Sequence, residues 1–379
     1  MLKYLPLLIA TAVIVNACTQ PNETAKYVGL KVYKLYDSAR TFDTTKQAAN
    51  KYRPVKIDVF YPSAQQPTQP ALTYGDILDM YEQRFNYNTP IDTCKKTSHM
   101  LAGMFAQYLH VDTAAKFLNY KLSIYSGLEL PAAKHPLIIY AASMNGSTMD
   151  NPVLFDTLAA HGYVVAVISS VGLYPGFMSA ASDLNEQVRD VLFAIEQMKA
   201  QPYVDANNIG ILSWSLGGLA ALKAAMVSPD IKCITSFDGN DMHAYGNDTA
   251  WDREYNQMRA LPPYSPQAIN VPYMYLRSEH PNKADSMYNP VLLTGSPSKY
   301  FVKFKDAIHE DFSCFPFIAK QVQPSLTDIH SNYHANIAKL TLLFFDEYLK
   351  HDKDAGVAAY INKLVTTDAA HYDSKWPSY

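Results

Sequence analysis

The stretch that decides the fold is Ser213-Trp214-Ser215-Leu216-Gly217-Gly218. An apolar run at 209–212 precedes it, and apolar residues at helical spacing follow it at 219–227. This order predicts a buried strand, a tight turn and a helix. A nucleophilic serine at such a turn needs small residues two positions before and after it, because strand and helix nearly touch there. Ser213 and Gly217 meet that need, so Ser215 is the predicted nucleophile; the alternative is a buried serine that caps the helix.

A second Ser-x-Gly sequence, Ser170-Val171-Gly172, follows another apolar run. It lacks the features of a nucleophilic turn, because Ile168 occupies the position that must be small. Residues 173–176 include a proline and a glycine and cannot begin a helix at once. Ser170 is therefore not expected to act as a nucleophile.

Continuous apolar runs of strand length recur along the chain and alternate with helical patterns such as 184–198 and 337–348. This alternation predicts an α/β fold, a mostly parallel sheet with helices on both faces. The expected buried strands are 137–142, 163–168, 209–212, 231–237, 271–276 and 300–304.

The segments ahead of these runs have a different pattern. Residues 27–36 and 55–61 alternate between polar and apolar, which predicts antiparallel edge strands with one wet face. Residues 72–118 have helical character without a buried-strand run, which predicts a helical cap inserted into the catalytic domain. With no internal repeat or linker, residues 27–379 are expected to form one domain.

A nucleophilic serine needs a histidine as base and a carboxylate that orients the histidine. In chain order after Ser215, His309 follows the last predicted strand and is the expected base. Asp238 follows the strand at 231–237 directly, and Glu279 and Asp285 beyond the next strand are its competitors as the acid. His330 and His334, four residues apart without a third ligand, are expected to form a helix face and not a metal site.

The N-terminus resembles a bacterial lipoprotein signal. Lys3 precedes an apolar stretch at 5–15, which leads into the lipobox-like Val15-Asn16-Ala17-Cys18. This stretch is too short for a membrane-spanning helix, the alternative, which would need ~20 apolar residues. The resemblance implies that residues 1–17 are removed, that Cys18 is lipidated and that residues 18–26 form a tether. The expected location is the bacterial cell envelope, with the lipid anchor on the periplasmic or outer-membrane face.

Charge and cysteine content exclude several other classes. The net charge of −3 has no long run of either sign, so nucleic acid is not an expected partner. Besides Cys18, the cysteines are Cys94, Cys233 and Cys314, an odd number without metal-site spacing. Cys233 lies in an apolar run and is expected to be buried; a bridge between Cys94 and Cys314 is left open.

These motifs resemble the branch of α/β-hydrolases that contains platelet-activating-factor acetylhydrolases and dienelactone-hydrolase-like proteins. The likeness extends over most of the mature chain and includes 53–62, 214–218, 237–239, 308–312 and 344–349. In acetylhydrolase-like members the acid lies on the strand after the nucleophile's helix, which favours Asp238.

The expected oxyanion donors are two backbone amides. The first, Leu216 N–H, stands at the start of the helix that follows the nucleophile. The second, Met144 N–H, is implied by the resemblance. The chain departs from the family pattern at two places: Ser213 replaces the usual glycine, and Ala142-Ser143-Met144-Asn145-Gly146-Ser147 replaces the usual His-Gly loop.

The function expected from these residues is a serine ester hydrolase that forms an acyl-enzyme on Ser215, with a small-molecule ester as substrate and no cofactor or metal. A secreted serine peptidase or a thioesterase is the enzymatic alternative, although no β-propeller repeat accompanies the triad. A lipid-anchored binding protein that retained the fold without the chemistry is the alternative from another class.

Overall fold

A computed structural model describes residues 25–42, 51–176, 178, 181–239, 241, 256, 257, 260–262, 265, 268–279, 295–327 and 333–375. The described residues thus exclude the signal peptide, Cys18 and the greater part of the tether. Asp285 and His330 also lie outside them. Among the described helices, none is both long and apolar enough to cross a membrane.

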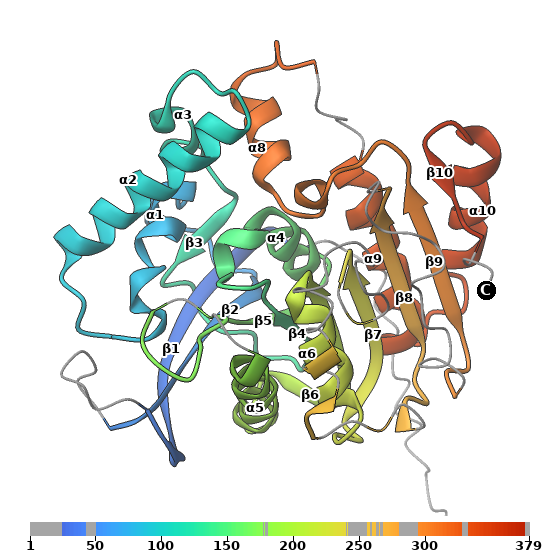
Figure 1. Cartoon of the computed structure of the whole chain (residues 1–379), viewed down its shortest axis with the longest axis horizontal. Coiled ribbons are helices and arrows are strands. Elements are labelled where there is room, and N and C mark those ends of the chain that lie inside the picture. Colours follow the sequence, from blue (N-terminus) through green and yellow to red (C-terminus); the bar gives the residue numbers. More distant parts are fainter. Residues whose placement is uncertain are drawn as a thin grey trace, which may run out of the picture.

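Within the described residues the chain forms a ten-stranded sheet in the order β10-β9-β8-β7-β6-β4-β5-β2-β1-β3 (Figure 1). Its six central strands, β4 to β9, are parallel to one another, whereas β2, β1 and β10 pair in antiparallel fashion. The predicted mostly parallel sheet is therefore confirmed. The strands are β1 Tyr27–Thr41, β2 Tyr52–Ser63, β3 Ile124–Ser126, β4 His135–Ala141, β5 Val164–Ile168, β6 Val204–Trp214, β7 Ile231–Phe237, β8 Tyr273–Ser278, β9 Lys299–Phe304 and β10 Tyr372–Asp373.

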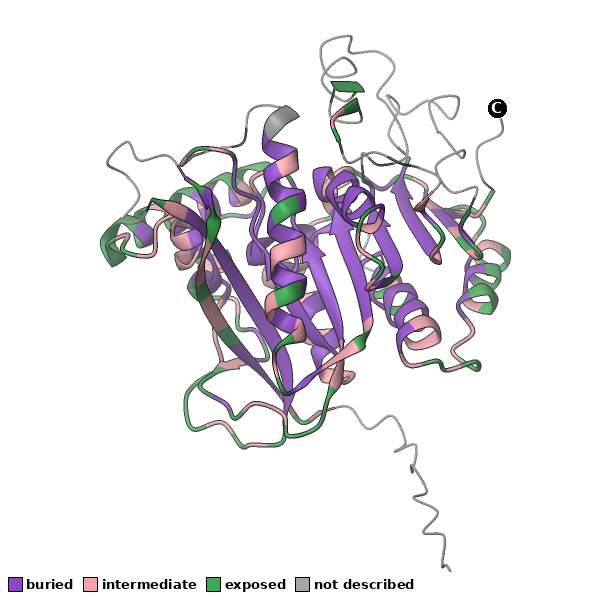
Figure 2. Ribbon diagram, turned by 90° about the horizontal axis from the view of Figure 1, so that it is seen from below, coloured by how far each residue is buried: buried purple, intermediate pink, exposed green. Residues whose placement is uncertain are grey.

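Helices cover both faces of the sheet, because alternate residues of the central strands point into two separate apolar clusters. Ile138 and Tyr140 of β4 belong to one cluster, and Leu137 and Ile139 belong to the other. In Figure 2 the strands in the middle of the sheet are buried along their length, whereas α5 is buried on one side and exposed on the other. The helices are α1 Tyr74–Asp79, α2 Ile91–Tyr108, α3 Ala114–Leu118, α4 Pro152–Ala160, α5 Ala181–Lys199, α6 Leu216–Ala225, α8 Phe315–Val322, α9 Tyr333–Leu349 and α10 Val357–Thr367.

The expectation that β2 is an edge strand with one wet face is wrong. The strand lies between β1 and β5, and it is buried from its second residue to its last. The alternation pattern gave the wrong prediction because the polar residues of β2 are paired inside the protein and not hydrated. Arg53 forms an ion pair with Asp190 of α5, and Lys56 pairs with Asp58 on the same strand.

The segment predicted as a cap contains α1, the 3₁₀ turn η1 (Glu82–Arg84), α2 and α3, all between β2 and β3. These helices lie beside α8 at one end of the sheet (Figure 1). Phe105 of α2 stacks on Phe315 of α8 with ring centroids 4.3 Å apart. The segment thus closes over the same end of the sheet at which β6 and β7 finish.

The three described cysteines are all free and buried. The bridge left open between Cys94 and Cys314 is therefore not formed. Cys233 is fully buried in β7, as its apolar surroundings predicted.

Candidate active site

Ser215 occupies the turn between β6 and α6 in a conformation that a serine rarely adopts. Its φ of 56° and ψ of −126° lie outside the regions favoured by residues with a side chain. Its N–H donates to the Phe237 carbonyl at the end of β7, at 3.0 Å. The Ser215 carbonyl accepts the N–H of Gly218, also at 3.0 Å. The turn is thus held in place by the neighbouring strand and by the first turn of α6.

The small residues around Ser215 are required by the backbone. A side chain at Gly217 would overlap the carbonyl oxygens of Ala141 and Ala142, where β4 ends. Ser213, where the resembled family has glycine, is accommodated because its hydroxyl donates to the Thr235 carbonyl of β7 at 3.2 Å. The substitution at 213 therefore fills space beside a backbone acceptor and leaves the turn intact.

His309 lies in the 3₁₀ turn η6 (His309–Phe312), and the structure brings it together with Asp238. His309 Nδ1 lies 2.6 Å from Asp238 Oδ2. Because an ionised carboxylate only accepts hydrogen bonds, this contact places the proton on Nδ1 and leaves Nε2 as the basic nitrogen. The Asp238 side chain is fully buried, whereas that of His309 is 29% exposed.

Asp238 is held by a residue that the sequence did not single out. Ser278, the last residue of β8, donates its N–H to Asp238 Oδ1 at 3.0 Å and its hydroxyl to Oδ2 at 2.8 Å. Asp238 itself has a φ of 45°. The two Ser278 donors and His309 Nδ1 thus hold the carboxylate in place. A serine at the end of a strand carries too little sequence signal to have been found beforehand.

The competing acids are placed differently. Glu279 is 44% exposed and pairs with Lys303 at 3.2 Å. Asp285 lies outside the described residues. His334 is buried in α9 and contacts Asn151 at 3.1 Å, so it forms part of the interior and not an exposed helix face. Burial lowers the pKa of His334 to about 4, which keeps it neutral.

An aromatic wall lies behind the histidine, and the sequence reasoning did not assign it. Trp214 stacks on His309 with centroids 5.1 Å apart, and its indole N–H donates to the His309 carbonyl at 3.3 Å. Phe315 meets Trp214 edge-on at 6.1 Å. Together with the Asp238 contact, this stacking fixes the plane of the imidazole.

The two expected oxyanion donors lie on separate elements. Leu216 is the first residue of α6, and the first amides of a helix have no acceptor within it. Met144 lies in the oxyanion loop (residues 142–147), which follows β4, and is 38% exposed. The next residue, Asn145, has a φ of 59°, so the loop turns sharply just after Met144.

A pocket of about 370 Å³ lies between the C-terminal end of α2 and the His309 turn. Ile308, which precedes that turn, and Asp311, which lies within it, form part of the pocket wall. Its remaining lining comes from Tyr108, Leu109, His110, Pro316, Ser325, Leu326 and Thr327. In the described part of the chain, no group of three His, Cys, Asp or Glu side chains is arranged for a metal ion.

Comparison with known proteins agrees with this architecture. The sequence profile of the Prolyl oligopeptidase family matches residues 152–307, a region that contains Ser215 and Asp238 and ends just before His309. A solved structure, the ferulic acid esterase from Streptomyces cinnamoneus, superimposes with a TM-score of 0.58 at 17% identity. The superposition covers 88% of this chain and 93% of the esterase. The chain has the α/β-hydrolase fold.

The fold predicted from residues 213–218 and the apolar runs is thereby confirmed, and the family match supports a serine hydrolase. Comparison with curated proteins yields no match.

Proposed function

We propose that this α/β-hydrolase is a serine ester hydrolase with Ser215, His309 and Asp238 as its triad. The observation that carries the proposal is the 2.6 Å contact between His309 Nδ1 and the buried Asp238, together with the stacking of His309 on Trp214, the residue before Ser215 in its strained strand-to-helix turn. A serine capping a helix for structural reasons needs neither the strain nor an oriented histidine.

The proposed chemistry begins when Ser215 Oγ attacks the ester carbonyl and His309 Nε2 takes the hydroxyl proton. Asp238 stabilises the imidazolium, and the amides of Leu216 and Met144 hold the oxyanion. Collapse breaks the bond to the alcohol, which leaves with the proton from His309. Water, deprotonated by His309, then attacks the acyl-enzyme, and release of the acid restores Ser215.

The volume of the pocket beside the His309 turn supports a small molecule as the substrate, since small-molecule sites usually occupy ~300–1,000 Å³. The pocket adjoins the triad through Ile308 and Asp311, and its lining does not include Ser215 or His309. Its lining mixes apolar side chains such as Leu109 and Leu326 with the hydroxyls of Ser325 and Thr327. The structural likeness to a ferulic acid esterase makes feruloyl esters sensible members of the first substrate panel.

A serine peptidase is the second candidate, and the match to the Prolyl oligopeptidase family favours it. The same triad cleaves amides, so the two activities differ in the pocket and in protonation of the leaving group. Parallel assays with p-nitrophenyl esters and with peptide p-nitroanilides separate them. We expect ester turnover to exceed anilide turnover; the opposite ranking would make the chain a peptidase.

Labelling with a fluorophosphonate tests whether the site is catalytic at all. We expect the wild-type protein to be labelled and to hydrolyse p-nitrophenyl esters, with both properties lost in Ser215→Ala. A folded wild-type protein that shows neither would be a binding protein with a hydrolase fold.

We further propose that the chain is a bacterial lipoprotein anchored through Cys18 at the cell envelope, because the lipobox-like sequence lies directly after a short apolar stretch. Cys18→Ala is expected to release the protein from the membrane fraction while ester hydrolysis continues. Unchanged membrane fractionation of that variant would contradict the anchor.

A further inference from the structure

Asp150 is a buried carboxylate directly beneath the oxyanion loop, at the end of the 3₁₀ turn η2 (Thr148–Asp150). Its Oδ2 accepts the N–H of Ser143 at 3.0 Å and the hydroxyl of Tyr140 at 3.0 Å. The N–H of Ser147 lies 3.4 Å from the other oxygen, Oδ1. The carboxylate is therefore bonded to both ends of the loop that carries Met144.

These bonds act on the peptide unit whose N–H is the proposed oxyanion donor. The amide of Met144 and the carbonyl of Ser143 belong to one planar peptide group. That carbonyl accepts the N–H of Gly146 at 2.8 Å, and the Ser143 N–H on its other side is bound to Asp150. A side chain at Gly146 would overlap the Asp150 carboxylate. The direction of the Met144 N–H thus depends on Asp150.

The cap forms further hydrogen bonds to this loop and to the 3₁₀ turn that follows it. Tyr81, which follows α1, donates its hydroxyl to the Asn145 carbonyl at 2.9 Å. Tyr74 of α1 donates to the Met149 carbonyl at 3.0 Å. The residue after Met144 is therefore bonded to the cap, while the residue before it is bonded to Asp150.

The Asp150 carboxylate is desolvated and is faced by weakly acidic side chains. Burial raises the pKa of Asp150 to about 6 from the ordinary 3.8, even though its hydrogen bonds oppose the shift. The titratable groups that face it are Tyr140 of β4, Tyr74 and Tyr81 of the cap, and Cys314 at the start of α8.

We infer that Asp150 and Tyr81 are positioning residues that aim the Met144 N–H at the oxyanion. The inference rests on the proposed ester hydrolysis. In the resembled family a His-Gly sequence occupies this loop, so here the carboxylate and the cap tyrosine maintain a loop of different sequence.

The test compares Asp150→Asn with Asp156→Asn. Asp156 lies in α4, and burial likewise raises its pKa to about 6. In Asp150→Asn, either orientation of the new amide turns its NH₂ group toward a backbone N–H, of Ser143 or of Ser147. We expect kcat for p-nitrophenyl acetate at pH 8 to fall by about 10–100-fold with KM changed by less than about twofold. Asp156→Asn is expected to keep both constants within about twofold of wild type.

A second pair of variants keeps the test decisive if Asp150→Asn does not fold. Tyr81→Phe removes only the hydroxyl that binds the loop. The control, Tyr61→Phe, removes a buried hydroxyl that donates at 2.6 Å to the carbonyl of Leu128, a residue outside the loop. Tyr81→Phe is expected to lower kcat by about 3–10-fold at constant KM, and Tyr61→Phe to leave both constants unchanged. Acylation and deacylation both pass through an oxyanion, so the effect appears whichever step limits turnover.

The outcomes separate this inference from the proposed function. An active wild type whose folded Asp150→Asn and Tyr81→Phe variants behave like their controls would overturn the positioning role and leave the hydrolase in place. A fall in kcat that is accompanied by a changed KM and a lower thermal stability would also overturn it, because that result indicates a structural role. A wild type without ester turnover and without fluorophosphonate labelling would remove both proposals.

Discussion

Two strands of this sheet, β5 and β6 on either side of β4, lead into the same Ser-x-Gly pattern and form unlike structures. β6 leads into Ser215-Leu216-Gly217, where the serine adopts a φ of 56° and a helix begins at once. β5 leads into Ser170-Val171-Gly172, where the serine is fully buried and its N–H donates to the Gly146 carbonyl at 3.0 Å. The three letters Ser-x-Gly therefore do not decide the backbone conformation of the serine; the neighbouring residues do.

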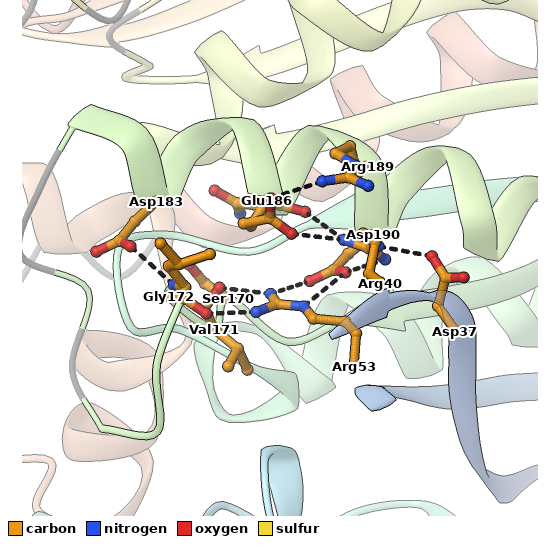
Figure 3. A network of polar contacts seen from close by, with 12 residues as sticks. Asp37, Arg40, Arg53, Ser170, Val171, Gly172, Asp183, Glu186, Arg189 and Asp190 are labelled. Atoms are coloured by element: carbon orange, nitrogen blue, oxygen red, sulfur yellow. Dashed lines mark hydrogen bonds and ion pairs between the residues drawn. The ribbon is translucent and has the colours of Figure 1, made fainter. Parts of the chain in front are cut away.

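The strand end at Ser170 is held by an ionic network (Figure 3). Arg53 of β2 donates to the carbonyls of Val171 and Gly172 and forms an ion pair with Asp190 of α5. Asp183 accepts the N–H of Leu173 at 2.8 Å. Charged groups here satisfy the backbone of a loop that has no helix to continue into. After Ser215 the chain continues directly into α6, whose own hydrogen bonds satisfy most of the backbone. The first amides of the helix have no acceptor within it and stay available for a substrate.

The largest expected effect contrasts the two serines. Ser215→Ala is expected to lower ester turnover by about four to six orders of magnitude, because the acyl-enzyme cannot form. Ser170→Ala is expected to change turnover by less than about tenfold, since Ser170 belongs to the interior. Single-turnover kinetics with a p-nitrophenyl ester measure both. A catalytic defect of equal size in Ser170→Ala would break the comparison.

The next prediction concerns the carboxylate that orients His309. Asp238→Asn is expected to lower kcat by about 10⁴, because an amide favours the wrong imidazole tautomer. Glu279→Gln, which affects an exposed ion pair with Lys303, is expected to change kcat by less than about tenfold. Steady-state kinetics on folded proteins rank the two variants. The reverse ranking would assign the acid to the end of β8.

Glycine substitutions sharpen the comparison through stability. Gly217→Ala would drive a methyl group into two backbone carbonyls and is expected to cost about 3 kcal/mol or more of unfolding free energy. Gly172→Ala would bring its methyl 3.1 Å from the Asp183 carboxylate, which can shift, so a cost below about 1 kcal/mol is expected. Urea unfolding measures both. Equal costs would mean that the two turns are packed alike.

The smallest expected effect concerns the pH dependence of the unfolding free energy, through His334 near the His309 turn. The pKa of His334 is lowered to about 4 from the ordinary 6.5, so its stabilising effect is complete above pH 6.5 and is lost as pH falls toward 4. The loss amounts to at most about 3 kcal/mol. His334 contacts Asn151, whose amide donates to the Phe312 carbonyl of the His309 turn at 3.1 Å.

His334→Gln is therefore expected to flatten the decline of unfolding free energy between pH 6.5 and pH 4. His99→Gln, at an exposed position of α2, serves as the control and is expected to retain the wild-type decline. Denaturant titrations at four or five pH values provide the measurement. An equally steep decline in His334→Gln would assign the acid sensitivity to other groups.

Local sequence was sufficient for the fold and for the identity of the turning serine. Strands buried on both faces appear as continuous apolar runs, and a nucleophilic turn imposes small residues at fixed offsets from Ser215. These are short-range constraints, so they can be seen without knowing which segments meet. The same reasoning failed for β2, because Arg53, Lys56 and Asp58 are indistinguishable in sequence from solvated residues until their partners are known.

The tertiary structure decided what depends on segments far apart in the chain. Asp238 and Glu279 both follow parallel strands, and only the packing of β7, β8 and the His309 turn determines which carboxylate contacts the imidazole. The contacts of Ser278 and Asp150 likewise follow from the fold, because a hydrogen bond needs a distance of about 3 Å and a direction that sequence spacing does not fix.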